Sequence, residues 1–158
     1  MITIEIPGEP VPKARPKFAR VGRGDGSRVV AYTPSGTRGY ESQIKLMGKL
    51  AMGEAPLLTG ALSLDVVATR SLLKSMSGVK RKAALEGRLH PTTRPDADNY
   101  LKIAADALIG IVYADDSQLV EQHVCKIYGE KPGLVITIKP IGEGETNARS
   151  ETRSHDAG

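Results

Sequence analysis

The 158-residue chain contains one cysteine, Cys125, one phenylalanine and no tryptophan. One cysteine cannot form a disulfide within the chain or supply a cysteine-based zinc site, and we expect Cys125 to be a small core residue in a strand. No apolar run approaches the roughly 18 residues that a membrane-spanning helix requires. The first ten residues lack the basic and apolar segments of a signal peptide. These absences favour a cytoplasmic protein with no membrane partner and a core of Ile, Leu, Val and Ala.

Motifs for nucleotide cofactors and for histidine metal sites are also missing. The sequence holds no Walker A loop, and GRGDG at 22–26 neither follows a strand nor opens a helix, as a dinucleotide fingerprint must. The three histidines, His90, His123 and His155, lack metal-ligand spacing. We therefore expect no nucleotide cofactor.

Positive charge is concentrated in two windows, although the net charge is only +4. Residues 12–39 carry seven Lys or Arg and one Asp, and residues 70–94 carry seven Lys or Arg and one Glu. Each window therefore has a net charge of +6, which leaves −8 for the rest of the chain. Such segregation favours a polyanionic partner, because each neutralised phosphate releases counterions. A basic surface that only keeps the protein soluble is the alternative, and charge alone does not separate the two.

The apolar pattern predicts an α/β fold of mixed α+β type, in which a small single-layer mixed sheet packs with helices. Alternating apolar residues predict strands at 2–6, 62–68, 119–128 and 133–139, and a 3.6-residue repeat predicts helices at 37–53, 77–87 and 98–110. Residues 8–36 hold four prolines and five glycines and predict a loop or a loose hairpin. We expect one domain over 1–140 and a disordered tail over 141–158.

Five aspartates and a single lysine lie in residues 94–118, RPDADNYLKIAADALIGIVYADDSQ. Asp96 and Asp98 precede or open the predicted helix, and Asp115 and Asp116 follow it. A helix over 98–110 is about 18 Å long at ~1.5 Å per residue. The next six residues can extend about 20 Å at ~3.3 Å each. An extended return can therefore bring the two pairs of acids into one cluster.

Clustered carboxylates require a cation, because charges about 4 Å apart repel by roughly 4 kcal/mol per pair at an effective dielectric near 20. Mg²⁺ is suited to the role, since it binds a few carboxylates together with water and substrate phosphate. Lys102 lies one turn after Asp98 and can neutralise charge on a phosphate. Taken singly, these residues have structural alternatives: Asp98 as a helix N-cap, the DD pair as a turn, and Lys102 with Asp106 as an exposed ion pair.

The segment RPDADNYLKIAADALIG, followed by YADDSQ, resembles the signature of the RusA family of Holliday junction resolvases. The stretches IPGEPVPKARPKFAR at 6–20, AYTPSGTRGYE at 31–41 and KIYGEKPGLVITI at 126–138 are also similar, so the likeness covers about residues 2–139. The resemblance implies a small homodimeric α/β endonuclease that uses Mg²⁺, with Mn²⁺ as a possible substitute, to nick four-way DNA junctions symmetrically.

The resemblance also implies roles for individual residues. The family's three essential acids fall on Asp96, Asp98 and Asp116, its catalytic lysine falls on Lys102, and Asp115 is a further candidate metal ligand. The residues expected to grip the DNA backbone without reading its sequence are Lys13, Arg15, Lys17 and Arg20. The founding member has a basic residue directly before the first acid, where this chain has Pro95, so Arg94 is the candidate replacement.

These observations predict a metal-dependent endonuclease that resolves Holliday junctions in recombination and repair, in a bacterial or phage-infected cell. Two alternatives stay open. The first is another structure-selective nuclease, such as a flap or fork enzyme, because junction preference depends on the geometry of the dimer. The second is a DNA-structure-binding protein without activity, which the acids disfavour, since a pure binder gains nothing from carboxylates beside phosphate.

Overall fold

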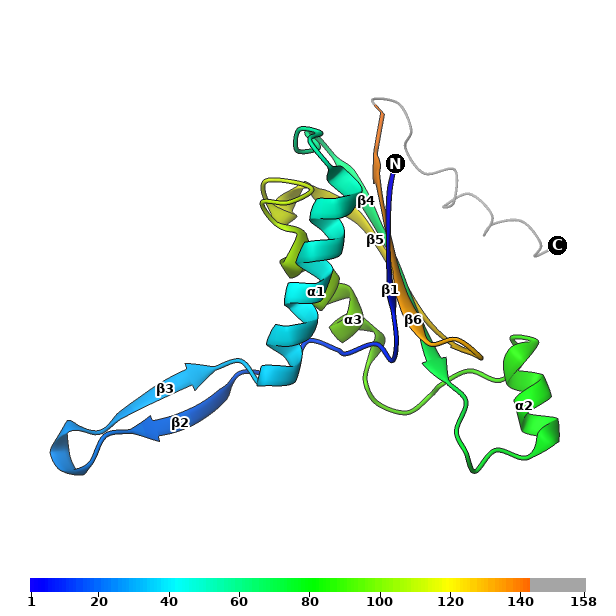
Figure 1. The fold of residues 1–158 in the computed structure, drawn as a ribbon, viewed down its shortest axis with the longest axis horizontal. Coiled ribbons are helices and arrows are strands. Elements are labelled where there is room, and N and C mark those ends of the chain that lie inside the picture. Colours follow the sequence, from blue (N-terminus) through cyan, green and yellow to red (C-terminus); the bar gives the residue numbers. More distant parts are fainter. Residues whose placement is uncertain (143–158) are drawn as a thin grey trace, which may run out of the picture.

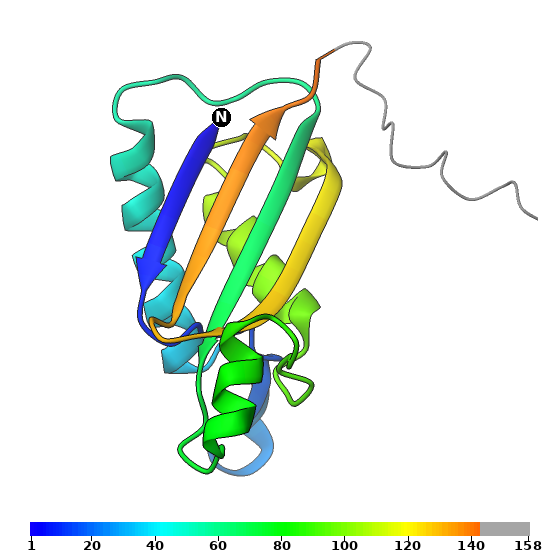
Figure 2. The ribbon, with the colours of Figure 1, turned by 90° about the vertical axis from the view of Figure 1, so that its right-hand side faces the viewer.

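The computed structural model describes residues 1–142, which form a four-stranded sheet with two long helices on one face (Figures 1 and 2). The strand order is β1 (Ile2–Pro7), β6 (Gly133–Pro140), β4 (Leu62–Ser71) and β5 (Leu119–Gly129). β4 and β5 run parallel, and the other neighbours are antiparallel. The predicted mixed α+β fold is therefore confirmed. The predicted tail lies outside the described residues from position 143 onward.

The sheet buries one face because its strands alternate apolar and polar residues with a period of two. Register places Ile4 beside Ile136, and Ile136 beside Val66, so that apolar residues of three strands form one row. All three side chains are at most 2% exposed. The predicted inward-facing positions of the second strand, Leu62, Leu64, Val66 and Ala68, are likewise buried.

Helices α1 (Ser35–Met52) and α3 (Ala97–Leu108) cover the buried face. They approach closely at Gly48, where a Cβ atom would lie 2.7 Å from Cδ2 of Leu108. The N-cap of α3 is Asp96 and not Asp98, which lies in the first turn, so the structural alternative of Asp98 as the N-cap is wrong. At the other end Gly110 adopts φ +75°, a conformation that glycine reaches at little cost and that ends the helix. Within residues 1–142 no helix has the length and apolar character to cross a membrane.

The second face of the sheet carries neither α1 nor α3 (Figure 2). Cys125 lies on this face, paired with Val67, and is exposed, so the prediction of a core cysteine is wrong. β5 does have a strand pattern, but beyond the register shift after Leu119 its odd-numbered positions, Cys125 among them, point away from the helices. Helix α2 (Gly78–Leu85) lies at the far end of β4. On α1, Tyr40 is buried in the core, whereas Leu46 and Leu50 are 57% and 67% exposed.

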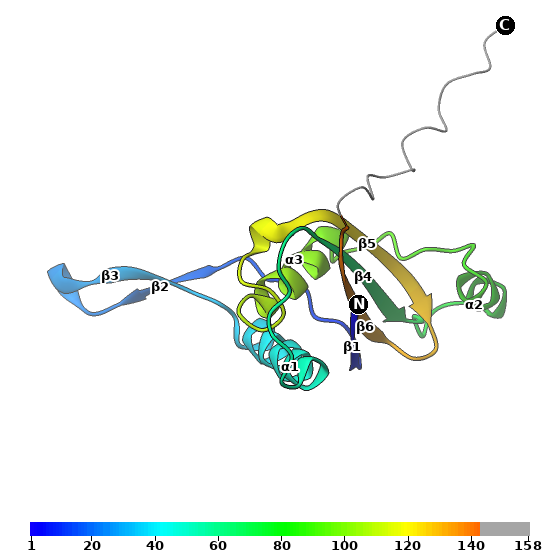
Figure 3. The ribbon, with the colours of Figure 1, turned by 90° about the horizontal axis from the view of Figure 1, so that it is seen from above.

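A two-stranded hairpin projects from the body of the protein (Figures 1 and 3). Its strands are β2 (Lys17–Val21) and β3 (Arg28–Tyr32), which pair antiparallel with each other. GRGDG, the glycine-rich motif at 22–26, forms the tip, with a 3₁₀ turn η1 at Gly24–Gly26. The hairpin predicted within residues 8–36 is therefore confirmed.

The buried hydroxyls of the core allow a matched test of the packing. Tyr113 Oη donates to the carbonyl oxygen of Ala105 at 2.6 Å, and Tyr113 is fully buried. We predict that Tyr113→Phe lowers the free energy of unfolding by about 1 kcal/mol, because it removes this hydrogen bond. Tyr40→Phe is the control: the Tyr40 hydroxyl donates to no acceptor within residues 1–142, so its removal should reduce stability less than Tyr113→Phe does. Urea unfolding measures both, and equal losses in the two variants would contradict the assignment.

Candidate nucleic-acid interface and acidic residues

The segment that leads into α3 is fixed to the sheet by two cationic side chains. Arg70 of β4 donates from Nη1 to the carbonyl oxygen of Arg94 at 3.2 Å. Lys126 of β5 donates from Nζ to the carbonyl oxygens of Thr93 at 2.9 Å and Pro95 at 2.8 Å. The peptide bond between Arg94 and Pro95 is cis. These bonds place the start of α3 at the end of β4.

The same end of β4 also holds the chain that follows β1. Arg70 Nε donates to Glu9 Oε1 at 2.9 Å, and Ser71 Oγ donates to Glu9 Oε2 at 2.8 Å. Burial raises the pKa of the Glu9 carboxyl, but the hydrogen bonds from Ser71 and Arg70 outweigh it, so that the pKa is lowered. Beyond Glu9 the chain crosses α3, where the backbone N–H of Lys13 donates to the carbonyl oxygen of Asn99 at 2.9 Å.

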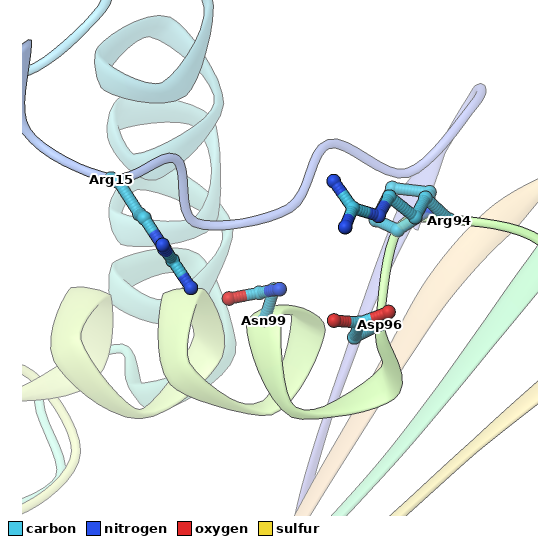
Figure 4. A pocket seen from close by; sticks show the side chains of 5 residues that line it. Arg15, Arg94, Asp96 and Asn99 are labelled. Carbon is cyan, nitrogen blue, oxygen red and sulfur yellow. The ribbon is translucent and has the colours of Figure 1, made fainter.

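This crossing creates a pocket of about 360 Å³ at the first turn of α3 (Figure 4). Its lining residues are Arg15, Arg94, Pro95, Asp96 and Asn99. Figure 4 shows Arg15 and Arg94 on either side, with Asn99 and the Asp96 carboxylate between them. The fold thus brings two predicted DNA-binding residues together with one predicted catalytic acid. Two guanidinium groups at one pocket suit an anion such as phosphate.

Lys102 and Lys13 share one carboxylate farther along α3. Asp106 Oδ2 lies 3.6 Å from Lys102 Nζ and 3.4 Å from Lys13 Nζ, and Lys13 also donates to Glu41. Burial lowers the pKa of the Lys13 ammonium, but Glu41 and Asp106 outweigh it, so that its pKa is raised. The ion pair of Lys102 with Asp106, which was the structural alternative for Lys102, is therefore present. Lys13 was expected to bind DNA, but it lies between two acids and joins α1 to α3.

The second acid pair lies in the turn that leads from α3 into β5. Asp115 forms a capping box around the 3₁₀ turn η2 (Asp116–Gln118): its Oδ1 accepts from the N–H of Ser117 at 2.8 Å. These bonds from Ser117 hold the pKa of the Asp115 carboxyl below its ordinary value. The Gln118 side chain donates to the carbonyl oxygens of Leu58 and Gly60, both at 3.1 Å, just before β4 begins. The turn is therefore held at the start of β4.

The two pairs of acids consequently lie at opposite ends of α3, which spans about 18 Å at ~1.5 Å per residue. Across residues 1–142, no three His, Cys, Asp or Glu side chains come close enough to hold one metal ion. The predicted cluster of Asp115 and Asp116 with Asp96 and Asp98 is thus wrong for a single chain. The connection does not extend back along α3, because the N–H of Gly110 donates to the carbonyl oxygen of Tyr113 and closes a tight turn. A three-carboxylate magnesium site does not fit one copy of this chain.

Sequence reasoning missed the residues that position the pocket: Glu9, Arg70, Asn99 and Lys126. Arg70 and its partner Glu9 are separated by 61 residues, so no local pattern joins them. Asn99 stands inside the motif that carries the resemblance, yet its amide had no assigned role. The capping box did have a sequence signal, because an Asp followed three residues later by Gln is a capping pattern.

Comparison with known proteins identifies the family of the chain. The family model described as "Endodeoxyribonuclease RusA" matches residues 7–139, a span that contains the pocket, both acid pairs and the hairpin. A protein of Bacillus subtilis (strain 168), named "Uncharacterized protein YqaN", is 35% identical over 142 residues, which are 89% of this chain and 96% of that protein. The chain belongs to the RusA endodeoxyribonuclease family.

Proposed function

We propose that this protein is a Holliday junction resolvase that nicks two strands of a four-way DNA junction during recombination and repair in the cytoplasm. The observation that carries the proposal is the pocket at the start of α3, where Arg15 and Arg94 lie beside Asp96 in a RusA-family chain. Guanidinium groups can each hold two oxygens of a phosphate. The two arginines can attract the DNA backbone, and the exposed carboxylate of Asp96 then lies next to the bound phosphate.

The residues of the pocket have separate roles in this proposal. Arg15 and Arg94 bind the phosphate at the cut site, and the Asn99 amide orients it against Asp96. Asp98 lies in the same first turn of α3 and is exposed. Lys102 is 64% exposed one turn later and adds a positive charge near the leaving group. Lys17 and Arg20, which are exposed on the hairpin, contact the backbone of the duplex that carries the cut site.

A divalent cation, Mg²⁺ or Mn²⁺, is part of the proposal, although one chain does not assemble its ligands. The separation of the acid pairs supports a homodimer that completes the site. In a symmetric dimer, Asp116 of one copy would meet Asp96 and Asp98 of the other, and the contact would occur twice. Asp115 is the weaker candidate ligand, because its carboxylate already caps a turn. Two equal sites would account for two paired nicks.

The primary test compares a labelled four-way junction with a linear duplex of the same sequence, with and without Mg²⁺. We predict paired nicks on the junction, dependent on Mg²⁺ and at least 100-fold slower in Asp98→Asn, about the size of one lost catalytic electrostatic contact. Glu130→Gln, which removes an exposed acid in the β5–β6 turn, is the control and should cut normally. Equal cutting of the linear duplex or of a flap substrate would overturn the junction preference.

Mixed dimers test whether the acids act across the two copies. Asp98→Asn and Asp116→Asn chains carrying different tags are co-expressed, and dimers with one chain of each kind are purified. One of the two sites is then intact, so we predict nicking at about half the wild-type rate with single, unpaired nicks. Each variant alone should be inactive. If mixed dimers are as inactive as their parents, the two copies do not share their catalytic sites. The nuclease assignment is then decided by the primary test alone.

Lys13 and Arg15 should respond differently to the loss of their charge. We predict that Lys13→Gln lowers the free energy of unfolding by about 1–2 kcal/mol, because Glu41 and Asp106 lose their partner. Arg15→Gln should leave stability unchanged and reduce the slope of log affinity against log salt by about 0.9, the value of one phosphate contact. Urea unfolding and junction binding at several salt concentrations measure the two effects. An unchanged salt slope in Arg15→Gln would remove Arg15 from the DNA contacts.

A further inference from the structure

The hairpin of residues 17–32, named here the ribbon, leaves several large apolar side chains exposed to solvent. Its exposed apolar residues are Phe18 (72%), Val29 (65%), Val21 (50%), Tyr32 (48%) and Val30 (37%). Figures 1 and 3 show that the ribbon stands away from the sheet and its helices. A lone two-stranded hairpin is at best marginally stable in water. These exposed apolar side chains therefore indicate that a partner binds to the ribbon.

The charges of the ribbon indicate the partner. Its charged residues are four cations, Lys17, Arg20, Arg23 and Arg28, and one acid, Asp25. Pairing places Arg28 on one face, beside Val21, and Arg20 on the other, beside Val29. Cations and apolar groups thus alternate on both faces. Two ribbons packed together would oppose eight cations, which disfavours a second ribbon as the partner and favours a polyanion.

The dimensions of the ribbon match those of duplex DNA. The major groove, about 12 Å wide, admits a two-stranded β-ribbon. Strands of five residues extend about 17 Å at ~3.4 Å per residue. This length corresponds to about five base pairs at ~3.4 Å each. The ribbon can therefore follow a short stretch of groove without bending.

The chain connects the ribbon directly to the pocket. Arg15, which lines the pocket with Asp96, is two residues before the first residue of β2. A DNA strand whose phosphate lies between Arg15 and Arg94 consequently reaches the base of the ribbon next. The ribbon is thus placed to contact the duplex that carries the cut site and not a distant one.

We propose that the ribbon inserts into the major groove of the duplex next to the cut site, where Arg20 and Arg28 contact phosphates and Phe18 and Val29 contact base edges. This inference rests on the proposed DNA substrate. It adds a groove contact within about five base pairs of the cut phosphate to the binding surface formed by the pocket.

Binding is measured on a four-way junction with the Asp98→Asn chain and without metal, so that cleavage does not interfere. We predict that Arg20→Ser/Arg28→Ser weakens binding and reduces the salt slope by about 2, the value of two phosphate contacts. Lys80→Ser/Lys82→Ser, on helix α2 at the opposite side of the molecule, is the matched control and should change the slope far less (Figure 1). Equal changes in the two pairs would show general charge attraction and overturn the proposal.

Groove insertion is tested separately by dimethyl sulfate, which methylates guanine N7 in the major groove. We expect protection of guanines within about five base pairs of the cut phosphate. Phe18→Ser/Val29→Ser should lose this protection while keeping the thermal unfolding temperature of the parent, because both side chains are exposed. Protection of the backbone without protection of N7 would overturn groove insertion.

Light scattering separates DNA from a second copy as the partner. If either ribbon variant dissociates a parent dimer into monomers, the ribbon serves as a contact between copies and the proposal fails. An unchanged mass with reduced binding supports it. Failure of the resolvase proposal is distinguishable, because it would appear as absent nicking by the wild-type chain with Mg²⁺, which these binding measurements do not use.

Discussion

Arg70 is the side chain on which the geometry of the pocket depends, because it joins three segments that are distant in the sequence. Its guanidinium group binds Glu9 after β1 and the backbone of Arg94 before α3, while its own strand lies inside the sheet. Burial lowers the pKa of Arg70, but its bond to Glu9 and the charges around it outweigh this effect and raise the pKa, so that the cation is always present. This link holds the chain that leads to Arg15 and the chain that leads to Asp96 at one end of β4, and the bond from Lys13 N–H to the Asn99 carbonyl joins them again at α3.

Helix α3 then determines how far apart the acids lie. Its apolar residues are buried in the core, and this packing holds the helix against the sheet. Asp96 and Asp98 are at its first turn, and Asp116 lies beyond its last. Rigid separation of this kind is unfavourable for a site within one chain, but it suits a symmetric pair, in which each end can meet the opposite end of a second copy.

Sequence reasoning predicted the parts of the fold that depend on local periodicity. The four strands of the main sheet, the three helices and the hairpin all follow from spacing of apolar residues and from proline and glycine content. The error at Asp115 and Asp116 arose because chain length gives only an upper limit on reach, and a tight turn after Gly110 uses little of it. Cys125 was misplaced because a strand pattern does not say which of the two faces of the strand the helices cover, and Cys125 lies on the face without α1 and α3. The bonds made by Arg70 and Lys126 are long-range, and no pattern within a single sequence encodes them.

The ribbon has a consequence for the protein before it meets DNA. Both of its strands have an outer edge whose backbone groups pair with no other strand within residues 1–142. Unpaired strand edges that carry valine and tyrosine are templates on which other molecules can add strands and aggregate. Lys17, Arg20 and Arg28 stand along these edges, and their repulsion keeps molecules apart at low ionic strength. The cations proposed to attract DNA would therefore also reduce self-association, and high salt would weaken both effects together.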